Sequence, residues 1–185
     1  MDHYATGLER LISRALESEG PAPAVDYALY YEPIGSNHGP VLAPAMYRRF
    51  VAPALRRVID CLRRHGIAYH FIWSAGRVDA LIPVWLDCGI NGVALNRGAE
   101  CGLGYGVLRR AFGRELRLMG GVSWQAALEG GPALERELAQ NARPLLEQGG
   151  YIPHLDDTVR VYMPFDVFRH YREHLDAVIS DVYGA

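Results

Sequence analysis

Residues 67–95 read IAYHFIWSAGRVDALIPVWLDCGINGVAL, and this stretch contains one complete strand-helix-strand pattern. Apolar and aromatic residues predominate at 67–73 and again at 92–95, and both runs predict buried strands. Between them, residues 77–88 have the length and apolar spacing of a helix. Two strands joined through a helix are expected to lie parallel, because the helical crossover brings the chain back to the same edge of the sheet.

The same alternation continues on both sides of this stretch. Further strands are predicted at 27–31, 116–119 and 151–152, and further helices at 1–19, 44–64, 106–112, 132–147 and 165–182. Five strands, each followed by a helical pattern, predict an α/β protein with a parallel sheet. We expect residues 1–185 to form a single domain.

Two folds have this alternation. In a doubly wound sheet a glycine-rich turn usually follows the first strand directly, but here that strand is followed by Glu32, Pro33 and Ile34. A (β/α)8 barrel is the second candidate, and its closure takes eight strands and about 250 residues. The 185 residues of this chain therefore predict a partial (β/α)8 TIM barrel of about five strand-helix units.

The charge and the composition exclude several classes of protein. Nineteen basic and 21 acidic side chains give a formal charge of −2, so nucleic acid is not an expected partner. All nineteen basic residues are arginines, and lysine does not occur. Schiff-base enzymes, pyridoxal-phosphate enzymes and P-loop nucleotidases need a lysine at the reacting centre, so these residues cannot build any of them.

The three cysteines, Cys61, Cys88 and Cys101, are widely spaced and include no CxxC pair. This spacing indicates neither a disulfide framework nor a zinc knuckle, and we expect reduced thiols in the cytoplasm. No apolar run approaches the roughly 18 residues that a membrane span needs, so a membrane is not an expected partner.

Several short motifs follow one another in a familiar order. They are Gly66-Ile67 leading to His70, LRLMGG at 116–121, and GGYIP at 149–153 with a terminal helix after a proline-containing loop. Together with residues 42–53, they resemble the uroporphyrinogen decarboxylase superfamily, which comprises porphyrinogen decarboxylases and corrinoid-dependent methyltransferases. Its members are single (β/α)8 barrels, and the resemblance implies that this chain covers strands four to eight. The first three strands are missing by this alignment, which predicts a fragment or a truncated gene product.

Departures from the family pattern limit what the resemblance implies. The methyltransferases carry a His-x-Cys pair and a later Cys that bind zinc, whereas His70 is followed by Phe and Ile, and Asp156 and Asp157 lie near the later position. Without the thiolates we expect no metal at these positions. The decarboxylases place a histidine where this chain aligns Asp157, with His154 three residues earlier. Their catalytic Asp and substrate-binding Arg lie in the missing strands, so the chain alone is expected to be inactive.

In barrels the active side is the carboxyl end of the strands. Alternation along 67–73 places Ala68, His70, Ile72 and Ser74 on one face. If that face points into the barrel, His70 lies near the mouth, where we expect it and Ser74 to bind substrate and His70 to shuttle a proton. The alternative is a core histidine whose ring bonds a backbone carbonyl.

Two carboxylates and an imidazole, those of Asp156, Asp157 and His154, lie within four residues after the last strand. Adjacent acids in a cleft can raise one pKa and create a general acid, or they can accept hydrogen bonds from pyrrole nitrogens. A turn or a helix cap is the alternative explanation of the acidic pair. Glu32, at the end of the strand at 27–31, has the same two interpretations.

Two further groups follow strand ends. Gly120 and Gly121 end the strand at 116–119, where free backbone N–H groups favour an anionic part of a substrate. Arg77 and Arg97 can hold carboxylates in a bidentate way, and the alternative is that both are solvated.

Three functions remain open at this point. The first is a uroporphyrinogen decarboxylase-like protein of porphyrin biosynthesis, a carboxy-lyase that by the resemblance needs no cofactor, because the protonated pyrrole is the electron sink. The second is a corrinoid-dependent methyltransferase-like protein, and the third is a non-catalytic tetrapyrrole-binding or scaffold protein. In each case the partner is a small molecule, either a tetrapyrrole or a methyl donor with its corrinoid. A partial barrel also leaves open parallel edges, so self-association is expected.

Overall fold

The structure is a computed structural model that describes residues 2–17, 25–96, 98–159 and 161–184. The chain divides into two compact units, Met1–Val93 and Ala94–Ala185. Arg97, one of the two arginines singled out in the sequence, lies outside the described residues.

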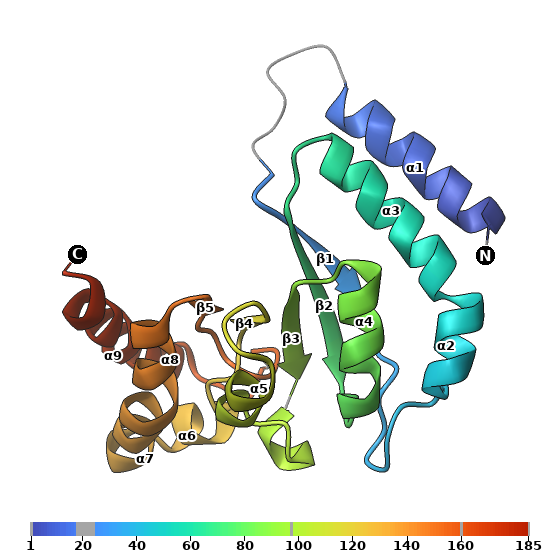
Figure 1. The fold of residues 1–185 in the computed structure, drawn as a ribbon. Helices are drawn as coiled ribbons and strands as arrows, with labels where there is room; N and C mark the ends of the chain where they lie inside the picture. The colour runs from blue at the N-terminus through green and yellow to red at the C-terminus, as the bar shows by residue number, and fades with distance from the viewer. Residues whose placement is uncertain (1, 18–24, 97, 160, 185) are drawn as a thin grey trace. The chain divides into compact units, whose positions relative to one another are not determined.

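The first unit combines parallel strands with a layer of helices (Figure 1). Its elements are α1 (Asp2–Leu16), β1 (Tyr27–Tyr31), α2 (Pro44–Phe50), α3 (Ala52–Arg64), β2 (Tyr69–Ala75), the 3-10 turn η1 (Asp79–Leu81) and α4 (Ile82–Cys88). β1 and β2 pair in parallel, with Tyr27 opposite Tyr69 and Tyr31 opposite Trp73. β1 occupies the residues predicted for it, and β2 begins and ends two residues later than predicted.

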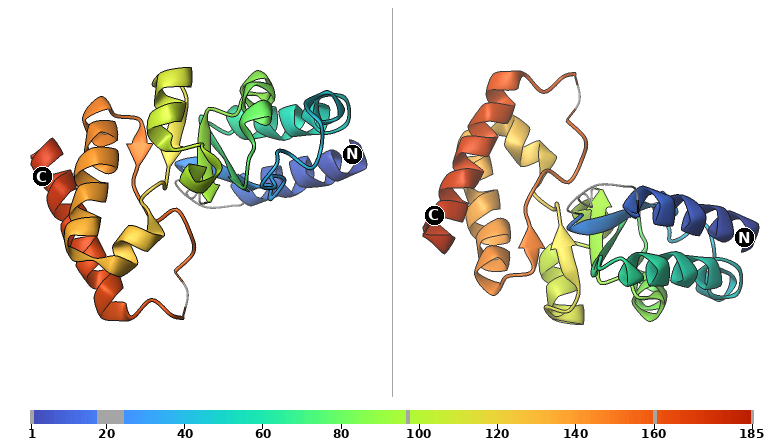
Figure 2. Two further views of the ribbon diagram at one scale, coloured as in Figure 1. Left: turned by 90° about the horizontal axis from the view of Figure 1, so that it is seen from below. Right: turned by 90° about the horizontal axis from the view of Figure 1, so that it is seen from above.

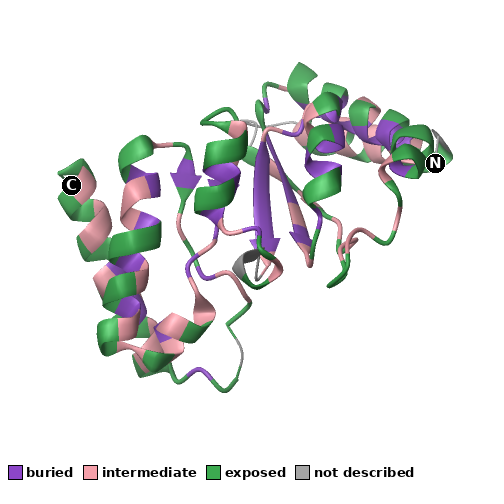
Figure 3. Ribbon diagram, turned by 60° about the horizontal axis from the view of Figure 1, so that its bottom comes forward, coloured by how far each residue is buried: buried purple, intermediate pink, exposed green. Residues whose placement is uncertain are grey.

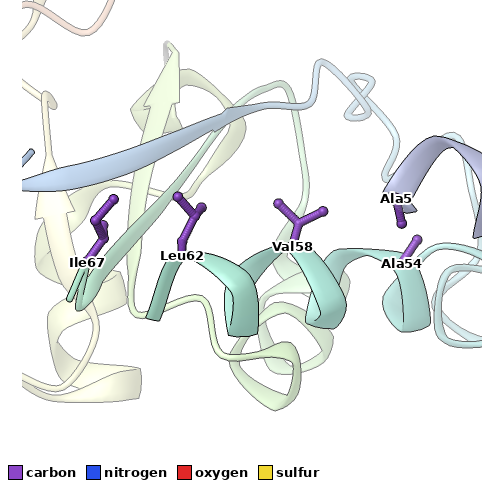
Figure 4. Close-up of a cluster of buried hydrophobic side chains, with 5 residues drawn as sticks. All are labelled: Ala5, Ala54, Val58, Leu62 and Ile67. Carbon is purple, nitrogen blue, oxygen red and sulfur yellow. The ribbon is translucent and has the colours of Figure 1, made fainter. Parts of the chain in front are cut away.

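One face of this pair of strands is covered by α1 and α3, which lie side by side (Figure 2). A buried cluster lies there (Figure 4), formed by Ala5, Ala54, Val58, Leu62 and Ile67. Ala28 and Tyr30 of β1 pack against it. Burying a Val, Leu or Ile side chain contributes about 1.5–3 kcal/mol, so the apolar stripes of the two helices stabilise the sheet directly.

The helix predicted at 44–64 is wrong as a single element, because the chain breaks it at Val51. There φ is −104° and ψ is −47°, and α3 starts anew with Pro53 in its first turn. Proline has no N–H for the bond to the fourth residue before it, and its ring crowds that carbonyl. Figure 1 shows the resulting change of direction between α2 and α3.

The second unit contains short parallel strands and a larger set of helices (Figure 1). Its elements are the 3-10 turn η2 (Gly98–Cys101), α5 (Tyr105–Phe112), β4 (Arg117–Met119), α6 (Trp124–Glu129), α7 (Gly131–Glu137), the π turn η3 (Leu138–Ala142), α8 (Arg143–Gln148), β5 (Tyr151–Ile152) and α9 (Phe165–Tyr183). β3 (Gly92–Asn96) spans the division between the units. α9 lies beside α8 (Figure 2), where the Tyr183 hydroxyl donates to the Leu146 carbonyl at 2.8 Å.

The helix predicted at 132–147 is also interrupted, because η3 separates α7 from α8. Pro144 lies in the first turn of α8 and cannot donate to the carbonyl four residues before it, a loss that the wider turn accommodates. α6 has no counterpart among the predicted helices. Ser123 caps it by accepting the Ala126 N–H at 3.2 Å.

The strands are neighbours in chain order, β1-β2-β3-β4-β5. A doubly wound sheet reverses its order at one point, so this order is that of successive strands in a (β/α)8 barrel. The predicted α/β fold with alternating strands and helices is therefore confirmed. β2 and β3 are largely buried, as the purple strands of Figure 3 show, whereas β1 alternates between half-buried and exposed residues.

Candidate functional site

The segments after β4 and β5 stay side by side beyond the strands. The Gly120 N–H donates to the Ile152 carbonyl at 2.8 Å, and the Val122 N–H donates to the His154 carbonyl at 3.0 Å. The Asp156 N–H then donates back to the Val122 carbonyl at 2.8 Å. This ladder brings three of the predicted residues together at the carboxyl ends of the strands, the edge at which barrels carry their sites.

Gly120 and Gly121 make room for two rings at this edge. At Gly121 φ is +80°, and a Cβ atom there would lie 2.4 Å from the ring of Tyr105. At Gly120 φ is +96°, and a Cβ atom would lie 3.0 Å from the ring of His154. Glycine adopts such φ values without strain, so both positions need it. Their predicted contact with an anion stays a prediction.

Two tyrosines that sequence reasoning missed hold this edge in place. The Tyr105 hydroxyl donates to the Met119 carbonyl and accepts from the Leu95 N–H at 2.9 Å. The Tyr151 hydroxyl donates to the Gly120 carbonyl at 2.8 Å. Burial raises the pKa of both tyrosines, so the hydroxyls stay protonated and act as fixed donors. No sequence signal marks them, because their partners lie in other elements.

Asp156 is both a helix cap and an acid with a raised pKa, the two alternatives that the sequence left open. Its Oδ1 accepts the N–H of Trp124, the first residue of α6, at 2.9 Å, so the carboxylate caps that helix. Burial raises the pKa of Asp156, and the charges of Glu137, Glu100 and Asp157 add to this, while the bond from Trp124 partly offsets it. A helix cap with a raised pKa is therefore also a candidate proton donor.

Asp157 and His154 flank this group. Asp157 Oδ1 accepts from the Thr158 N–H at 2.7 Å and from Asn96 Nδ2, at the end of β3, at 3.3 Å. The Oδ1 atom of Asn96 is buried and has no hydrogen-bond partner in the described part of the chain. The exposed His154 ring places Nδ1 2.6 Å from the Leu155 carbonyl. Asn96 was missed, because only the sheet order shows which strand end approaches the acidic loop.

Glu32 follows β1 in the first unit and has a partner that the sequence did not reveal. The Tyr47 hydroxyl donates to Glu32 Oε2 at 2.7 Å. Burial raises the pKa of Glu32, and the bond from Tyr47 partly lowers it. A pocket of about 180 Å³ lies beside it, lined also by Tyr30 and by apolar residues of α1 and α3. Glu32 is thus a second half-buried acid at a strand end.

Arg77 lies where the loops after β1 and β2 meet. Its backbone N–H donates to the Ser36 carbonyl at 2.7 Å, and its Nε atom lies 3.2 Å from Asp79 Oδ1. Both side chains of this ion pair are about half exposed. Arg77 therefore faces solvent with an acidic partner, and its predicted role as a carboxylate clamp stays a prediction.

The expected direction of His70 and Ser74 is wrong. His70 is opposite Ala28 in the register, and its Nδ1 atom lies 3.1 Å from the Tyr30 hydroxyl, on the face covered by α1 and α3. Ser74 shares that face by alternation, and both side chains are 0% exposed. Burial and the charge of Arg63 lower the pKa of His70, so its ring is neutral at pH 7. Period-two alternation groups residues on a face but does not say which face the helices cover.

The opposite face of β1 and β2 is aromatic. It carries Tyr27, Leu29 and Tyr31, each more than 40% exposed. Tyr31 stacks on Trp73, with ring centroids 4.3 Å apart and planes 8° apart. In a barrel, the face turned away from the helices is the interior one. The exposed side chains of β1 on this face are therefore aromatic or aliphatic, and His70 is not on this face.

The described residues show neither a metal-binding cluster nor a membrane-spanning helix. Within residues 2–17, 25–96, 98–159 and 161–184, no three His, Cys, Asp or Glu side chains are grouped so that they could hold a metal ion. In the same stretches, every helix is too short or too polar to cross a bilayer.

In the described residues, five parallel strands in chain order, alternating with helices, define an α/β protein whose sheet is compatible with a partial (β/α)8 barrel. Residues 32–176, most of the chain, match the family model described as uroporphyrinogen decarboxylase (URO-D). The chain belongs to the uroporphyrinogen decarboxylase family, and the resemblance read from its motifs is confirmed. None of the curated proteins compared with the chain matches it.

The raised pKa of Asp156 predicts a pH-dependent effect of Asp156→Asn on stability. Below the ordinary pKa of 3.8 the carboxyl is protonated in both states, so parent and variant should have similar free energies of unfolding. As the pH rises through that value, the folded parent is penalised by about 1.4 kcal/mol for each unit of pKa shift, and the variant escapes this cost. Urea denaturation at a series of pH values should show that the free energy of unfolding of the variant rises relative to that of the parent as the pH approaches 7.

Asp156→Ala separates this charge effect from the helix cap. Asn keeps an acceptor for the Trp124 N–H, whereas Ala removes it, so Asp156→Ala should be about 1 kcal/mol less stable than Asp156→Asn at every pH. A difference between the parent and Asp156→Asn that shrinks as the pH rises would contradict the raised pKa.

Proposed function

We propose that this chain is a uroporphyrinogen decarboxylase-like protein of porphyrin biosynthesis whose second unit supplies acidic groups to a tetrapyrrole site. The observation that carries the proposal is the half-buried Asp156, whose pKa is raised, beside Asp157 at the carboxyl ends of the strands. Pyrrole nitrogens are N–H donors, and carboxylate oxygens are the acceptors that fit them. The family match over residues 32–176 supports a small molecule as the partner.

The two acids suit different parts of the chemistry. In decarboxylation of an acetate side chain, the C–C bond to the carboxylate breaks, carbon dioxide leaves, and a proton takes its place on the carbon. A carboxyl group with a raised pKa, such as Asp156, retains its proton closer to neutral pH and can donate it. Asp157, which aligns with the histidine of the decarboxylases, is the proposed acceptor for a pyrrole N–H.

We propose that residues 1–185 form one partial barrel domain that lacks the first three strands. The described residues form five strands, whereas a closed barrel has eight. Positioning of reactants supplies about 7–11 kcal/mol of a barrier only where the geometry is fixed. The chain alone should therefore bind a tetrapyrrole without decarboxylating it, and the aromatic face of β1 and β2 should promote self-association. The cytoplasm stays the predicted location, because the spacing of the cysteines indicates no disulfide framework.

Binding of uroporphyrin tests the acidic site. Fluorescence titration of the parent chain should give saturable binding, and Asp156→Asn and Asp157→Asn should each weaken it about tenfold, because each removes a charged acceptor. Asp166→Asn, an exposed acid in the first turn of α9, is the matched control and should bind as the parent does. Equal affinities for all four proteins, or no binding by the parent, would refute the site.

An anaerobic assay with uroporphyrinogen, followed by chromatography of the products, tests the second half of the proposal. No turnover is expected from the parent. Turnover by the parent that disappears in Asp157→Asn would place the catalytic centre within this chain. It would contradict the proposal that the catalytic residues lie in the first three strands of the barrel.

A further inference from the structure

The second unit has a basic cavity at the end of the strands opposite to the acidic residues. It has a volume of about 400 Å³ and lies between the end of α5, the turn before β4, and the junction of η3 and α8. Arg109, Arg110 and Arg114 line it, together with Gln140 and Gln148. Of the described residues that line the cavity, none is acidic. Three guanidinium groups thus share one hollow in a chain whose formal charge is −2.

Arg109 is a built part of this cavity. Its side chain is 7% exposed and donates to the carbonyls of Gly113 at 3.2 Å, Gly149 at 3.0 Å and Gly150 at 3.3 Å. Its Nε atom is buried and has no hydrogen-bond partner among the described residues. A buried guanidinium bound only to neutral carbonyls keeps its full charge. Burial and the neighbouring charge of Arg114 lower the pKa of Arg109, as expected for a guanidinium group that has no acidic partner nearby in the described part of the chain.

Arg110 and Arg114 are exposed at the rim. In the part of the chain that the structure describes, neither side chain takes part in a hydrogen bond or an ion pair. Other arginines in this unit form ion pairs with acidic side chains: Arg143 with Asp181 at 2.6 Å, and Arg172 with Asp176 at 2.5 Å. A guanidinium group recognises planar or tetrahedral oxyanions through paired N–H groups. The rim therefore offers two such groups to a ligand from solvent.

The backbone beside the cavity is shaped to leave space for Arg114. At Gly149 φ is +76°, and a Cβ atom there would lie 3.0 Å from the Nη2 atom of Arg114. The π turn η3, which contributes Gln140, widens the helix on the other wall. Such turns occur frequently at functional sites. Amide side chains such as those of Gln140 and Gln148 add neutral donors to the charged ones.

We propose that this cavity binds a small oxyanion with at least two negative charges, such as the phosphate or polycarboxylate part of a metabolite. Arg109 supplies a fixed positive charge at the base, and Arg110 and Arg114 close on the anion from the rim. A cavity of 400 Å³ has the size of known small-molecule pockets. Because it adjoins the residues that precede β4 and β5, whereas the acidic residues follow them, the oxyanion is a second ligand and not the decarboxylated substrate.

Calorimetric titration of the full chain with inorganic phosphate and, separately, with citrate tests the proposal at constant ionic strength. Saturable binding of at least one of the two is expected, and the tighter one identifies the phosphate or the carboxylate source. Arg110→Gln and Arg114→Gln should each weaken this binding about tenfold, because each removes one charge-assisted contact. Both positions are exposed, so the variants should fold as the parent does. Added sodium chloride should weaken the binding further.

The control is Arg48→Gln, an exposed arginine in the last turn of α2, in the other unit. It should bind the anion as tightly as the parent. No saturable binding of either anion, or the same loss in Arg48→Gln as in the rim variants, would overturn the proposal. A loss of uroporphyrin binding in Asp156→Asn with phosphate binding intact would show that the two sites are separate.

Discussion

Gly121→Ala should destabilise the second unit by about 3 kcal/mol. The positive φ of +80° costs an L-residue roughly 1–2 kcal/mol, and crowding in a packed interior costs roughly another 1–3 kcal/mol. The new Cβ would lie 2.4 Å from the ring of Tyr105. That ring cannot move aside without breaking the bonds of its hydroxyl to Met119 and Leu95. Urea denaturation with far-UV circular dichroism measures the loss.

Gly102→Ala is the matched control. Its φ is +77°, almost the same as at Gly121, but a Cβ atom there meets nothing within 4 Å. It should therefore show only the backbone cost of about 1–2 kcal/mol. Equal losses in the two variants would mean that the contact with Tyr105 contributes nothing. Tetrapyrrole binding should fall in Gly121→Ala even under conditions where the protein remains folded, because the displaced ring lies beside the acidic edge.

Gly35→Ala should have an effect of similar size in the first unit, about 3 kcal/mol. A Cβ atom at Gly35 would lie 2.1 Å from the Ala75 carbonyl oxygen and 2.7 Å from a methyl group of the buried Val78. A backbone atom cannot yield as a flexible side chain does, so the loops after β1 and β2 must separate. Separation also costs the bond of the Arg77 N–H to Ser36, worth about 1 kcal/mol.

Gly7→Ala provides a control of opposite sign. Gly7 is exposed within α1, and a Cβ atom there meets nothing within 4 Å. Alanine in a helix is favoured over glycine, so this variant should gain about 0.8–1.0 kcal/mol. Limited proteolysis should show faster cleavage of the loop after β1 in Gly35→Ala than in the parent or in Gly7→Ala. A Gly35→Ala protein as stable as the parent would refute the close approach of the two loops.

Much of the candidate site could be found from the sequence, because strand ends carry sites in barrels. Asp156, Asp157, His154 and the two glycines after β4 were identified in this way, and the ladder beyond β4 and β5 brings Gly120, His154 and Asp156 together. Their partners could not be found. Asn96 approaches Asp157 only because β3, β4 and β5 are neighbours, and Tyr47 of α2 meets Glu32, which follows β1, only in the folded chain. These contacts join residues that lie far apart in the sequence, so no local sequence pattern predicts them.

The amino-acid sequence by itself determined the α/β class, the positions of the strands and the family, since periodicity, strand length and motif order are local properties of the chain. The helix breaks at Val51 and within Leu138–Ala142 were also encoded locally, by Pro53 and Pro144, although the periodic pattern masked them. Only the tertiary structure decided that His70 and Ser74 face the helices and that the aromatic face is open. A period of two sorts side chains into two faces, but the packing of α1 and α3 chooses which face is buried.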